Sequence, residues 1–542
     1  MRKKHFLFAS VLALLCGSST LHAQDFKLTS SGYFKNQGVD VMAFDDIYPE
    51  GHQGGVCIIM NGHRVATNGD IRLEATPGQW QPVPKQLDRK LGDNSITATL
   101  CYPDSSRHLT GFNPMIYPDL HLIYTVNVES KGKNIEVTVD LDRPIPQEFI
   151  GKVGFNLEFF PGSLFGKPWI MDGQSGIFPQ QPNSPLMTTQ PNYLHTGNYH
   201  DGKKSLADMD KLIGKGYSPI VADDIISEPY AKGTKFTSRP DDPYNKVSIE
   251  SLSGDLQLFD GRMNHNNGWF VLRSNIKPGV TKGAVKWIIT PNVVADWMYQ
   301  PVIQTSQIGY HPTQDKEAVI EMDIRDNRKE TAQIIRIDAD GEKVVKNVTP
   351  ANWGKFLRYN YLKVNFTDVK EPGLYKIKYN TSVSPIFRID NDVYARGVWQ
   401  PVLEYFLPVQ MCHMRVNEKY RVWHDCCHMD DAQMAPAHNH IDGYDQKEGL
   451  SKFKPGEVVP GVNIGGWHDA GDFDLRIESQ AGESYILALA YEAFHPNLDV
   501  TSIDQINRVT EIHQPDGKND LLQQVENGAL TVVNGYLALG RL

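Results

Sequence analysis

The sequence predicts a multidomain protein in which β-sandwich domains precede a helical region. Alternation of apolar and polar residues with a period of two marks strands over much of residues 25–390. After Asn391 the apolar spacing changes to that of helices. The chain has 542 residues, enough for about three to four domains of ~150 residues each.

Composition and charge exclude one class of partner. Hydrophobic residues make up 40% of the chain and charged residues 22%, which is ordinary for globular proteins. The formal net charge of −10 is spread along the chain, whereas nucleic-acid-binding domains carry a basic stripe. We therefore expect no nucleic-acid partner. No segment of the mature chain is predicted to be transmembrane.

The first 23 residues have the pattern of a signal peptide. Basic residues at 2–4 precede an apolar run over 6–15, and small residues follow up to Ala23. The run is too short to span a bilayer as a mature helix. We expect cleavage after Ala23 and export, periplasmic or secreted. Lipoprotein anchoring through Cys16 is a less favoured alternative, because the bulky Leu15 precedes it.

Residues 24–302 are predicted to form a large accessory β-sandwich domain. Residues 134–141, 153–159 and 284–289 alternate as half-buried strands do. Long segments rich in Gly, Pro, Asn and Asp, such as 173–192, read as loops. One large sandwich with elaborate loops is expected, and two smaller sandwiches are the alternative.

Residues 303–390 are predicted to form an immunoglobulin-like domain. Short strands at 318–324, 333–337 and 374–379 are separated by turn signals, such as the Glu-Pro-Gly sequence at 371–373. Short strands at this total length favour an immunoglobulin-like sandwich.

Residues 391–542 are predicted to be helical. A helix capped at Asn391 or Asp392 is expected to run toward Met414, with a possible kink at Pro401. Its predicted apolar face consists of Val398, Val402, Phe406 and Val409. Two further helices are predicted over 482–494 and 520–533, with long loops between the helices.

The strongest candidate for a functional site is the segment GGWHDAGD at 465–472. Asp469 and Asp472 are separated only by Ala470 and Gly471. Small residues let the backbone bend tightly and let a ligand approach. Paired carboxylates are suited to general acid/base chemistry. The alternative is an Asp-Gly turn in which one Asp caps the next helix.

Three segments together resemble glycoside hydrolase family 9. The sequences SQIGYHP at 306–312 and FTDVKEPGLY at 366–375 resemble the family's N-terminal immunoglobulin-like domain, and GWHDAGD at 466–472 resembles its catalytic loop. The resemblance covers about residues 304–542. It implies an (α/α)6 barrel, of which 391–542 is the N-terminal part, and inverting hydrolysis of β-1,4 or mixed-linkage glucans.

The resemblance also implies residue roles. Asp472 matches the general base, and Asp469 matches the residue that helps to position the attacking water. An inverting enzyme needs such a base and an acid ~6.5–9.5 Å away across the scissile bond. Trp467 is a candidate for stacking on a sugar face, and core packing is an equal alternative.

The general acid of the family is a Glu near the far C-terminal end of the barrel. About four to six of the twelve helices fit into the residues after Asn391. Glu478, Glu483 and Glu526 do not match the position of the acid, and none is assigned. We therefore expect a fragment of a longer enzyme, or a truncated gene product, that lacks the acid and hydrolyses glucans poorly or not at all. Uncovered apolar helix faces would favour aggregation.

A Cys/His cluster is the second candidate site. Some family members hold a structural zinc with two Cys and two His beside the catalytic loop, and CHMDDA at 427–432 resembles that segment. The matching ligands are Cys412, Cys427, His428 and His468, a set that suits tetrahedral Zn²⁺. Rival ligands are Cys426, His424 and His413. The alternative is buried free Cys with surface His.

Other cofactor and cysteine assignments stay open. Calcium is conceivable near Asp430, Asp431, Asp442 and Asp445, although the spacing differs from an EF-hand. No organic cofactor is expected. Of six cysteines, five remain after signal cleavage, an odd number that cannot pair completely. Cys57 and Cys101 lie in one predicted domain, where a disulfide is one alternative.

Three functions follow in order of preference. The first is an exported family 9-type glycosidase whose partner is a β-glucan polysaccharide or oligosaccharide. The second is a non-catalytic carbohydrate-binding or scaffold protein with a vestigial barrel. The third is a metalloprotein unrelated to sugars, which only the Cys/His cluster supports. The intact pair Asp469 and Asp472 favours the enzyme, and the missing acid favours the non-catalytic protein.

Overall fold

The computed structural model describes residues 25–45, 54–74, 76–77, 84–102, 120–183, 187–189, 225–263, 268–429, 432–434, 451–469 and 475–540. The predicted signal peptide lies outside these residues. The chain divides into two compact units, the first ending at Tyr299 and the second beginning at Gln300. Among the described residues, no helix combines the length and the apolar character needed to cross a membrane.

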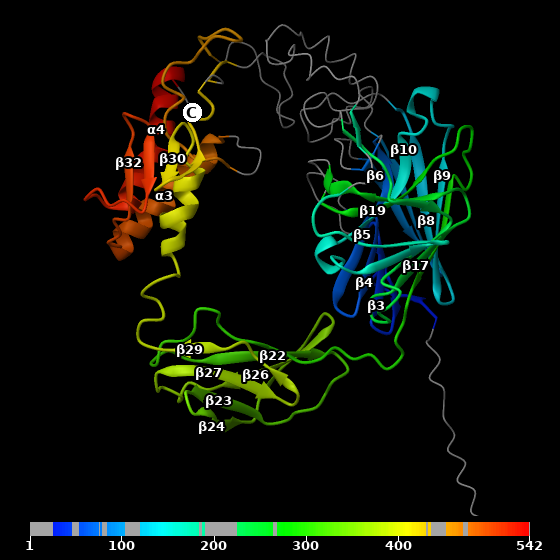
Figure 1. The fold of residues 1–542 in the computed structure, drawn as a ribbon, viewed down its shortest axis with the longest axis horizontal. Helices are drawn as coiled ribbons and strands as arrows, with labels where there is room; N and C mark the ends of the chain where they lie inside the picture. Colours follow the sequence, from blue (N-terminus) through cyan, green and yellow to red (C-terminus); the bar gives the residue numbers. More distant parts are fainter. Residues whose placement is uncertain are drawn as a thin grey trace, which may run out of the picture. The chain divides into compact units, whose positions relative to one another are not determined.

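The first unit is a β-sandwich of two nine-stranded antiparallel sheets (Figure 1). The first sheet has the order β1 (Lys27–Leu28), β2 (Phe34–Asn36), β3 (Val39–Ala43), β4 (Val56–Met60), β5 (His63–Leu73), β10 (Val153–Phe159), β19 (Phe270–Asn275), β18 (Leu256–Asp260) and β15 (Ala231–Gly233). The second has the order β12 (Gln174–Ile177), β11 (Pro168–Met171), β16 (Lys235–Ser238), β17 (Val247–Ser251), β20 (Val285–Pro291), β9 (Asn134–Leu141), β8 (Ile123–Lys131), β7 (Ser95–Cys101) and β6 (Lys85–Leu91). The short strands β13 (Met187–Thr189) and β14 (Ile225–Ser227) pair separately, and 3-10 turns occupy Gln147–Phe149, Pro161–Ser163 and Gly261–Met263.

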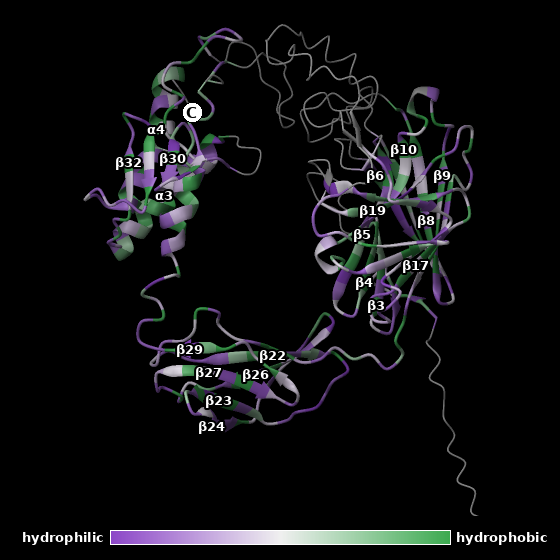
Figure 2. Cartoon of the chain, viewed as in Figure 1, coloured by the Kyte–Doolittle hydropathy of each residue, from purple (hydrophilic) through white to green (hydrophobic). Residues whose placement is uncertain are grey.

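The alternation in the sequence accounts for these strands. Residues 134–141 and 153–159 form β9 and β10, and 284–289 falls largely in β20. Hydrophobic and hydrophilic residues follow one another along the strands (Figure 2). The rings of Phe155 and Trp287, from opposite sheets, meet edge to face with centroids 5.0 Å apart. The described strands therefore make one large sandwich around a shared core.

A buried charged cluster lies in the first sheet. Arg273 Nη1 is 3.2 Å from Glu74 Oε1, and both side chains are 1% exposed. The Asn156 amide donates to the same oxygen at 2.6 Å. Burial raises the pKa of Glu74 to about 7, and this outweighs the opposing effects of Arg273 and Arg72.

Cys57 and Cys101 are both buried, and no disulfide joins them. The disulfide alternative for this pair is therefore wrong in this structure.

The immunoglobulin-like domain consists of two further antiparallel sheets. One has the order β21 (Val302–Gln304), β22 (Glu317–Asp323), β26 (Tyr359–Asn365) and β25 (Ala351–Phe356). The other has the order β24 (Gly341–Val348), β23 (Ala332–Asp338), β27 (Gly373–Tyr379) and β28 (Ser382–Val383), and β29 (Phe387–Ile389) also pairs with β27. Tyr310, from the 306–312 motif, packs edge to face on Phe366 and Phe387. Its hydroxyl accepts from Ser306 N and donates to Glu317 O, so the motif fixes the first turn of the domain.

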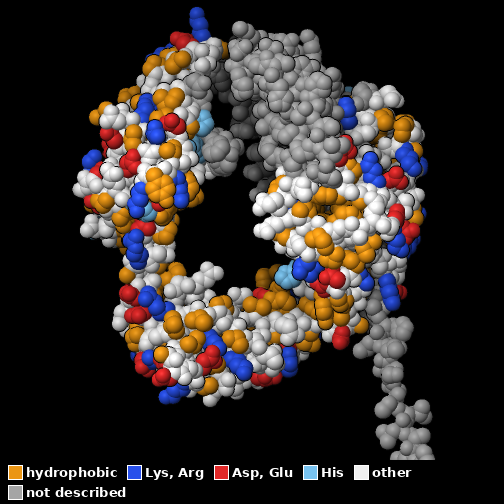
Figure 3. Space-filling model, viewed as in Figure 1, with side chains coloured by type: hydrophobic (Ala, Val, Ile, Leu, Met, Phe, Trp, Pro, Cys, Tyr) orange, Lys and Arg blue, Asp and Glu red, His pale blue; other side chains and the backbone are white. Residues whose placement is uncertain are grey.

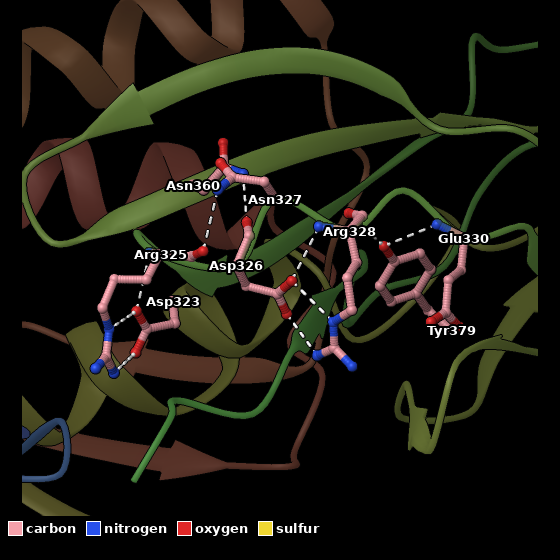
Figure 4. A network of polar contacts seen from close by, with 8 residues as sticks. All are labelled: Asp323, Arg325, Asp326, Asn327, Arg328, Glu330, Asn360 and Tyr379. Atoms are coloured by element: carbon pink, nitrogen blue, oxygen red, sulfur yellow. Dashed lines mark hydrogen bonds and ion pairs between the residues drawn. The ribbon is translucent and has the colours of Figure 1, made fainter. Parts of the chain in front are cut away.

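Two Asp–Arg pairs shape the turn between β22 and β23 (Figure 4). Asp323 accepts from the backbone and guanidinium of Arg325, and Asp326 does the same for Arg328. The Asn360 amide donates to Asp326 O at 2.8 Å and ties this turn to β26. The bond from Arg328 lowers the pKa of Asp326.

The C-terminal part combines helices with a small sheet. The long helices are α3 (Ile477–Phe494) and α4 (Asp520–Leu539), and a π-helical turn at Val402–Phe406 continues into α2 (Leu407–Gln410). The sheet has the order β31 (Arg421–His424), β30 (Arg415–Glu418), β33 (Val509–Ile512) and β32 (Thr501–Asp504). This sheet was not predicted, because four-residue strands carry too little alternation to be seen.

The predicted helix from 391 to Met414 is wrong in extent and in its buried face. Helix occupies only about residues 400–410. Val402 and Phe406 are 45% and 62% exposed, whereas Leu403 and Leu407 are buried. Val402 with Phe406 and Leu403 with Leu407 are both apolar pairs with a spacing of four, so the periodicity does not distinguish the two faces. The segment 402–406 also has the i→i+5 hydrogen bonds of a π turn.

Helices α3 and α4 pack against each other but expose many apolar side chains. The helix α4 is capped by Asn519, whose side chain accepts from Leu521 N and Leu522 N. The exposed large apolar residues of the two helices are Tyr485, Ile486, Leu489, Phe494, Leu522, Val533, Tyr536 and Leu537. Apolar side chains are visible at the surface of this part in Figure 3. A partial (α/α)6 barrel remains a prediction for these residues.

Candidate metal centre and catalytic loop

The loop 463–469 is held between α2 and α4 by backbone hydrogen bonds. Trp467 forms a β-bridge with Met411. On the two sides of this bridge, Cys412 N donates to Gly466 O at 2.9 Å and His468 N donates to Gln410 O at 2.8 Å. Two facing chain segments therefore carry Cys412 and His468 next to each other.

Two glycines make this close approach possible. Gly465 and Gly466 both have positive φ, 73° and 86°, a conformation that favours glycine. A Cβ on Gly465 would lie 2.2 Å from Asn527 O. On the side of α4, Gly466 N donates to Asn527 O, and the Asn527 amide donates back to Gly466 O, both at 3.0 Å. The Gly-Gly pair is thus required by the contact with α4.

Trp467 lies in the core of this part and not at a surface. Its side chain is 1% exposed, and its Nε1 donates to Gln524 Oε1 at 2.7 Å. A Cβ on Gly528 would lie 2.5 Å from the ring, so the indole packs directly on the α4 backbone. The expectation that Trp467 stacks on a sugar is therefore not supported by its position, and the core-packing alternative describes it.

Gln480, in the first turn of α3, binds the backbone of Trp467 with both amide atoms. Its Oε1 accepts from Trp467 N at 2.8 Å, and its Nε2 donates to Trp467 O at 3.0 Å. Sequence reasoning missed Gln480 and Asn527, because neither glutamine nor asparagine in a helix signals a contact with a distant loop.

The four residues predicted as metal ligands come together. They come from three segments: Cys412 after α2, Cys427 and His428 after β31, and His468 in the loop. One donor atom from each lies within 4.8 Å of all the others. Cys412 Sγ is 3.6 Å from Cys427 Sγ and 3.1 Å from His428 Nδ1, and Cys427 Sγ is 3.1 Å from His468 Nε2.

These distances fit a small tetrahedral ion. Zn–S and Zn–N bonds of about 2.3 and 2.0 Å give a tetrahedron with edges of about 3.3–3.8 Å. These three separations are close to such edges, and the other donor pairs lie within 4.8 Å. Hydrogen bonds, first from Cys412 and then from His424 and His468, lower the pKa of the Cys427 thiol, although burial opposes them. A thiolate is the form that binds a metal.

The rival ligands also have other contacts, although His424 hydrogen-bonds Cys427 as well. The ring nitrogens of His424 contact Asp425 O and Val409 O at 2.9 and 3.0 Å. His413 Nδ1 contacts Gly465 O at 3.0 Å, and the Cys426 side chain is exposed. Asp430, Asp431, Asp442 and Asp445, the residues considered for calcium, lie outside the described residues.

Asp469 follows the metal-ligand position directly and is exposed. Its Oδ2 is 3.4 Å from Arg476 Nε, at the start of α3. Glu483, one turn beyond Gln480 on α3, has a raised pKa, caused first by burial and then by the charge of Asp469. Its Oε2 is buried and has no hydrogen-bond partner among the residues that the structure describes. Asp472, the second carboxylate of the motif, lies outside the described residues.

The family comparison bears on the immunoglobulin-like domain. The family described as the cellulase N-terminal ig-like domain matches residues 298–384. The expected resemblance to family 9 glycoside hydrolases with an N-terminal immunoglobulin-like domain is confirmed through this domain. No curated protein matches the chain.

Solved structures of family 9 proteins resemble part of the chain. A metagenome-derived glycoside hydrolase family 9 endoglucanase is 23% identical over 43% of this chain and 40% of its own, with a TM-score of 0.32. A zinc-binding triple mutant of a family 9 endoglucanase is 23% identical over 41% and 38%, with a TM-score of 0.31. A family 9 protein of Bacteroides ovatus is 20% identical over 42% and 37%, with a TM-score of 0.31. The chain thus spans about 40% of the length of the first of these.

Proposed function

We propose that this chain carries the immunoglobulin-like domain and the first part of the catalytic domain of an exported, inverting family 9-type glycoside hydrolase. Its substrate class is β-1,4 or mixed-linkage glucan. The catalytic domain is an (α/α)6 barrel, and the exposed apolar side chains of α3 and α4 are those that such a barrel buries between neighbouring helices.

One observation carries the proposal. A cellulase-type immunoglobulin-like domain is followed in the same chain by a loop that joins a Cys₂His₂ cluster to an exposed carboxylate. His468 belongs to the cluster and Asp469 is the next residue. The loop is fixed from both sides, by α2 and α4, so its carboxylate is presented on a rigid support.

In this proposal Asp472 is the general base, and Asp469 helps to orient the attacking water. A carboxylate pair that holds one water lowers the entropic cost of attack and accepts its proton. Arg476 holds Asp469 from the α3 side. No Glu of the chain is assigned as the general acid.

The cluster of Cys412, Cys427, His428 and His468 is proposed to hold a structural Zn²⁺. A bound ion would supply a cross-link between the three segments, without taking part in the hydrolysis. The chain's own contribution is a preformed set of donors, two of them thiols and two imidazoles, with separations close to those of a tetrahedron.

The experiment uses a substrate that does not need a general acid. Fluoride leaves β-cellobiosyl fluoride with little protonation, so a base and a positioned water suffice for its hydrolysis. We expect the purified chain to release fluoride and form α-cellobiose, detected with a fluoride electrode and by NMR. Reducing-sugar release from β-glucan is expected to stay low. Asp472→Asn and Asp469→Asn should slow fluoride release by roughly 10²-fold or more.

Asp338→Asn, in the immunoglobulin-like domain, is the matched control and should leave the rate unchanged. Fluoride release that survives Asp472→Asn would remove that residue as the base. A chain that binds cello-oligosaccharides but releases no fluoride would favour the non-catalytic carbohydrate-binding function instead.

A further inference from the structure

We propose that Gln480 is a positioning residue that sets the geometry of the metal ligand His468 and of the carboxylate Asp469. This inference rests on the proposed function and extends it to a residue outside the cluster and the motif.

The first argument comes from the backbone geometry of Trp467. In the bridge between Met411 and Trp467, the residues on either side make the hydrogen bonds to the α2 segment. The N–H and C=O of Trp467 itself therefore point away from that segment, as they do at a non-hydrogen-bonded position of an antiparallel pair. Both groups meet the side-chain amide of Gln480. One glutamine side chain thus replaces a neighbouring strand on this side of the loop.

The second argument is the burial of this contact. Gln480 is 1% exposed and Trp467 is 1% exposed, so water has little access to replace a lost bond. A buried N–H or C=O without a partner costs about 1–3 kcal/mol. Loss of the amide would therefore favour a rotation of the Trp467 peptide units toward other partners.

The third argument is the position of Trp467 in the chain. His468 and Asp469 follow it directly, and the indole is fixed by Gln524 at its far end. A change in the peptide geometry of Trp467 is passed on to the next residue, because its own side chain cannot move. His468 Nε2, now 3.1 Å from Cys427 Sγ, would leave its place in the set of donors.

The test compares two buried glutamines. Gln480→Met removes both hydrogen bonds at nearly constant volume. Gln523→Met is the matched control, because Gln523 is 4% exposed on α4 and its side chain, within the described part of the chain, bonds Asp516 alone, at 2.8 Å. Both variants are made in the full chain. Zn²⁺ affinity is measured by competition with a chelator, and the site geometry by the visible absorption of the Co²⁺-loaded protein.

We expect Gln480→Met to weaken Zn²⁺ binding about tenfold, as loss of groups that orient metal ligands does, and to shift the tetrahedral Co²⁺ bands. Gln523→Met should bind as the unaltered chain does. Gln480→Glu keeps the acceptor for Trp467 N but places a carboxylate against Trp467 O, so it should also weaken binding. Gln480→Glu replaces Gln480→Met in the test if the methionine variant does not fold.

Three results would overturn the inference. Equal affinity and an unchanged Co²⁺ spectrum in Gln480→Met would remove the role of Gln480 while leaving the zinc site intact. An equal loss in Gln523→Met would show that the effect is one of general stability. An unaltered chain that takes up neither ion would refute the metal site and this inference together.

Discussion

Replacement of Trp467 by Phe tests whether this ring serves the core of the helical part. Phe keeps an aromatic face but lacks the indole N–H and about three ring atoms. If the ring served only to stack on a sugar, its loss would lower glucan binding and leave the packing of α4 unchanged. Because the ring is buried on α4, we expect the opposite: the substitution should weaken the packing of α4 directly.

The magnitude follows from two contacts. Gln524 Oε1 loses its donor, now at 2.7 Å, and a buried acceptor without a partner costs about 1–3 kcal/mol. The missing ring atoms remove a further roughly 1–2 kcal/mol of apolar burial. Together the substitution should lower the free energy of opening α3 and α4 by roughly 2–5 kcal/mol.

The assay is hydrogen exchange with mass spectrometry, because a chain of several domains does not unfold in one step. Peptides from α3 and α4 report local opening free energies. Trp353→Phe is the control, since Trp353 is 55% exposed in the immunoglobulin-like domain and should change stability by less than about 0.5 kcal/mol. Unchanged protection of α4 in Trp467→Phe would refute the reasoning.

Three further predictions concern the rest of the chain. Chelation of the metal, or Cys412→Ser, should lower the melting temperature of the helical part. The loss corresponds to about 2.7 kcal/mol of unfolding free energy if the ion had been present at 100 times its Kd. Calorimetry measures the transition, and an unchanged transition counts against the metal site. Glu74 has a folded-state pKa of about 7 against a reference of 4.5, so the folded sandwich binds the extra proton and should lose stability as pH rises from about 4.5 to 7. Urea unfolding at both pH values measures this, and Glu74→Gln, which resembles the protonated form, should flatten the slope; an equal slope in the variant would assign it to other groups. Asp326→Asn should destabilise the immunoglobulin-like domain by only about 1 kcal/mol at pH 7, because its partner Arg328 is half-exposed. This loss of stability should vanish as the pH falls through the reference pKa of 3.8 and the lowered folded-state pKa below it, because Asp326 is then protonated in both states. Thermal unfolding of the unaltered chain and the variant at pH 7 and pH 3 measures the difference.

The strands were the most predictable part of the fold. In β9, which contains Val137, burial alternates at every second position, so local sequence suffices to assign the strand. The strand β10 is buried at all its positions, so the half-buried strand expected there is buried on both faces. The order of eighteen strands in two sheets depends on contacts between distant residues. No pattern within one segment encodes that order.

The helical part was less predictable for two physical reasons. Apolar residues lie on two neighbouring faces of this helix, so the spacing of Val402 and Phe406 did not reveal that Leu403 and Leu407 are the buried ones. Strands such as β30 exist because β33, about 90 residues later, lies beside it. At the candidate site, Cys and His could be singled out by their chemistry. Gln480 and Asn527 could not, since their role exists only once α3, α4 and the loop are together.

The spacing of the metal-binding side chains along the chain suggests an order of assembly. Cys412 and Cys427 are 15 residues apart, and Cys427 and His468 are 41 apart. The entropy cost of closing a loop grows with its length, by about 0.6 kcal/mol for each doubling. We therefore expect Cys412, Cys427 and His428 to meet first during folding, and His468 to join them last. The loop with Asp469 would then join the cluster after the other three ligands, so a chain in which only these three have met would not yet present its carboxylate.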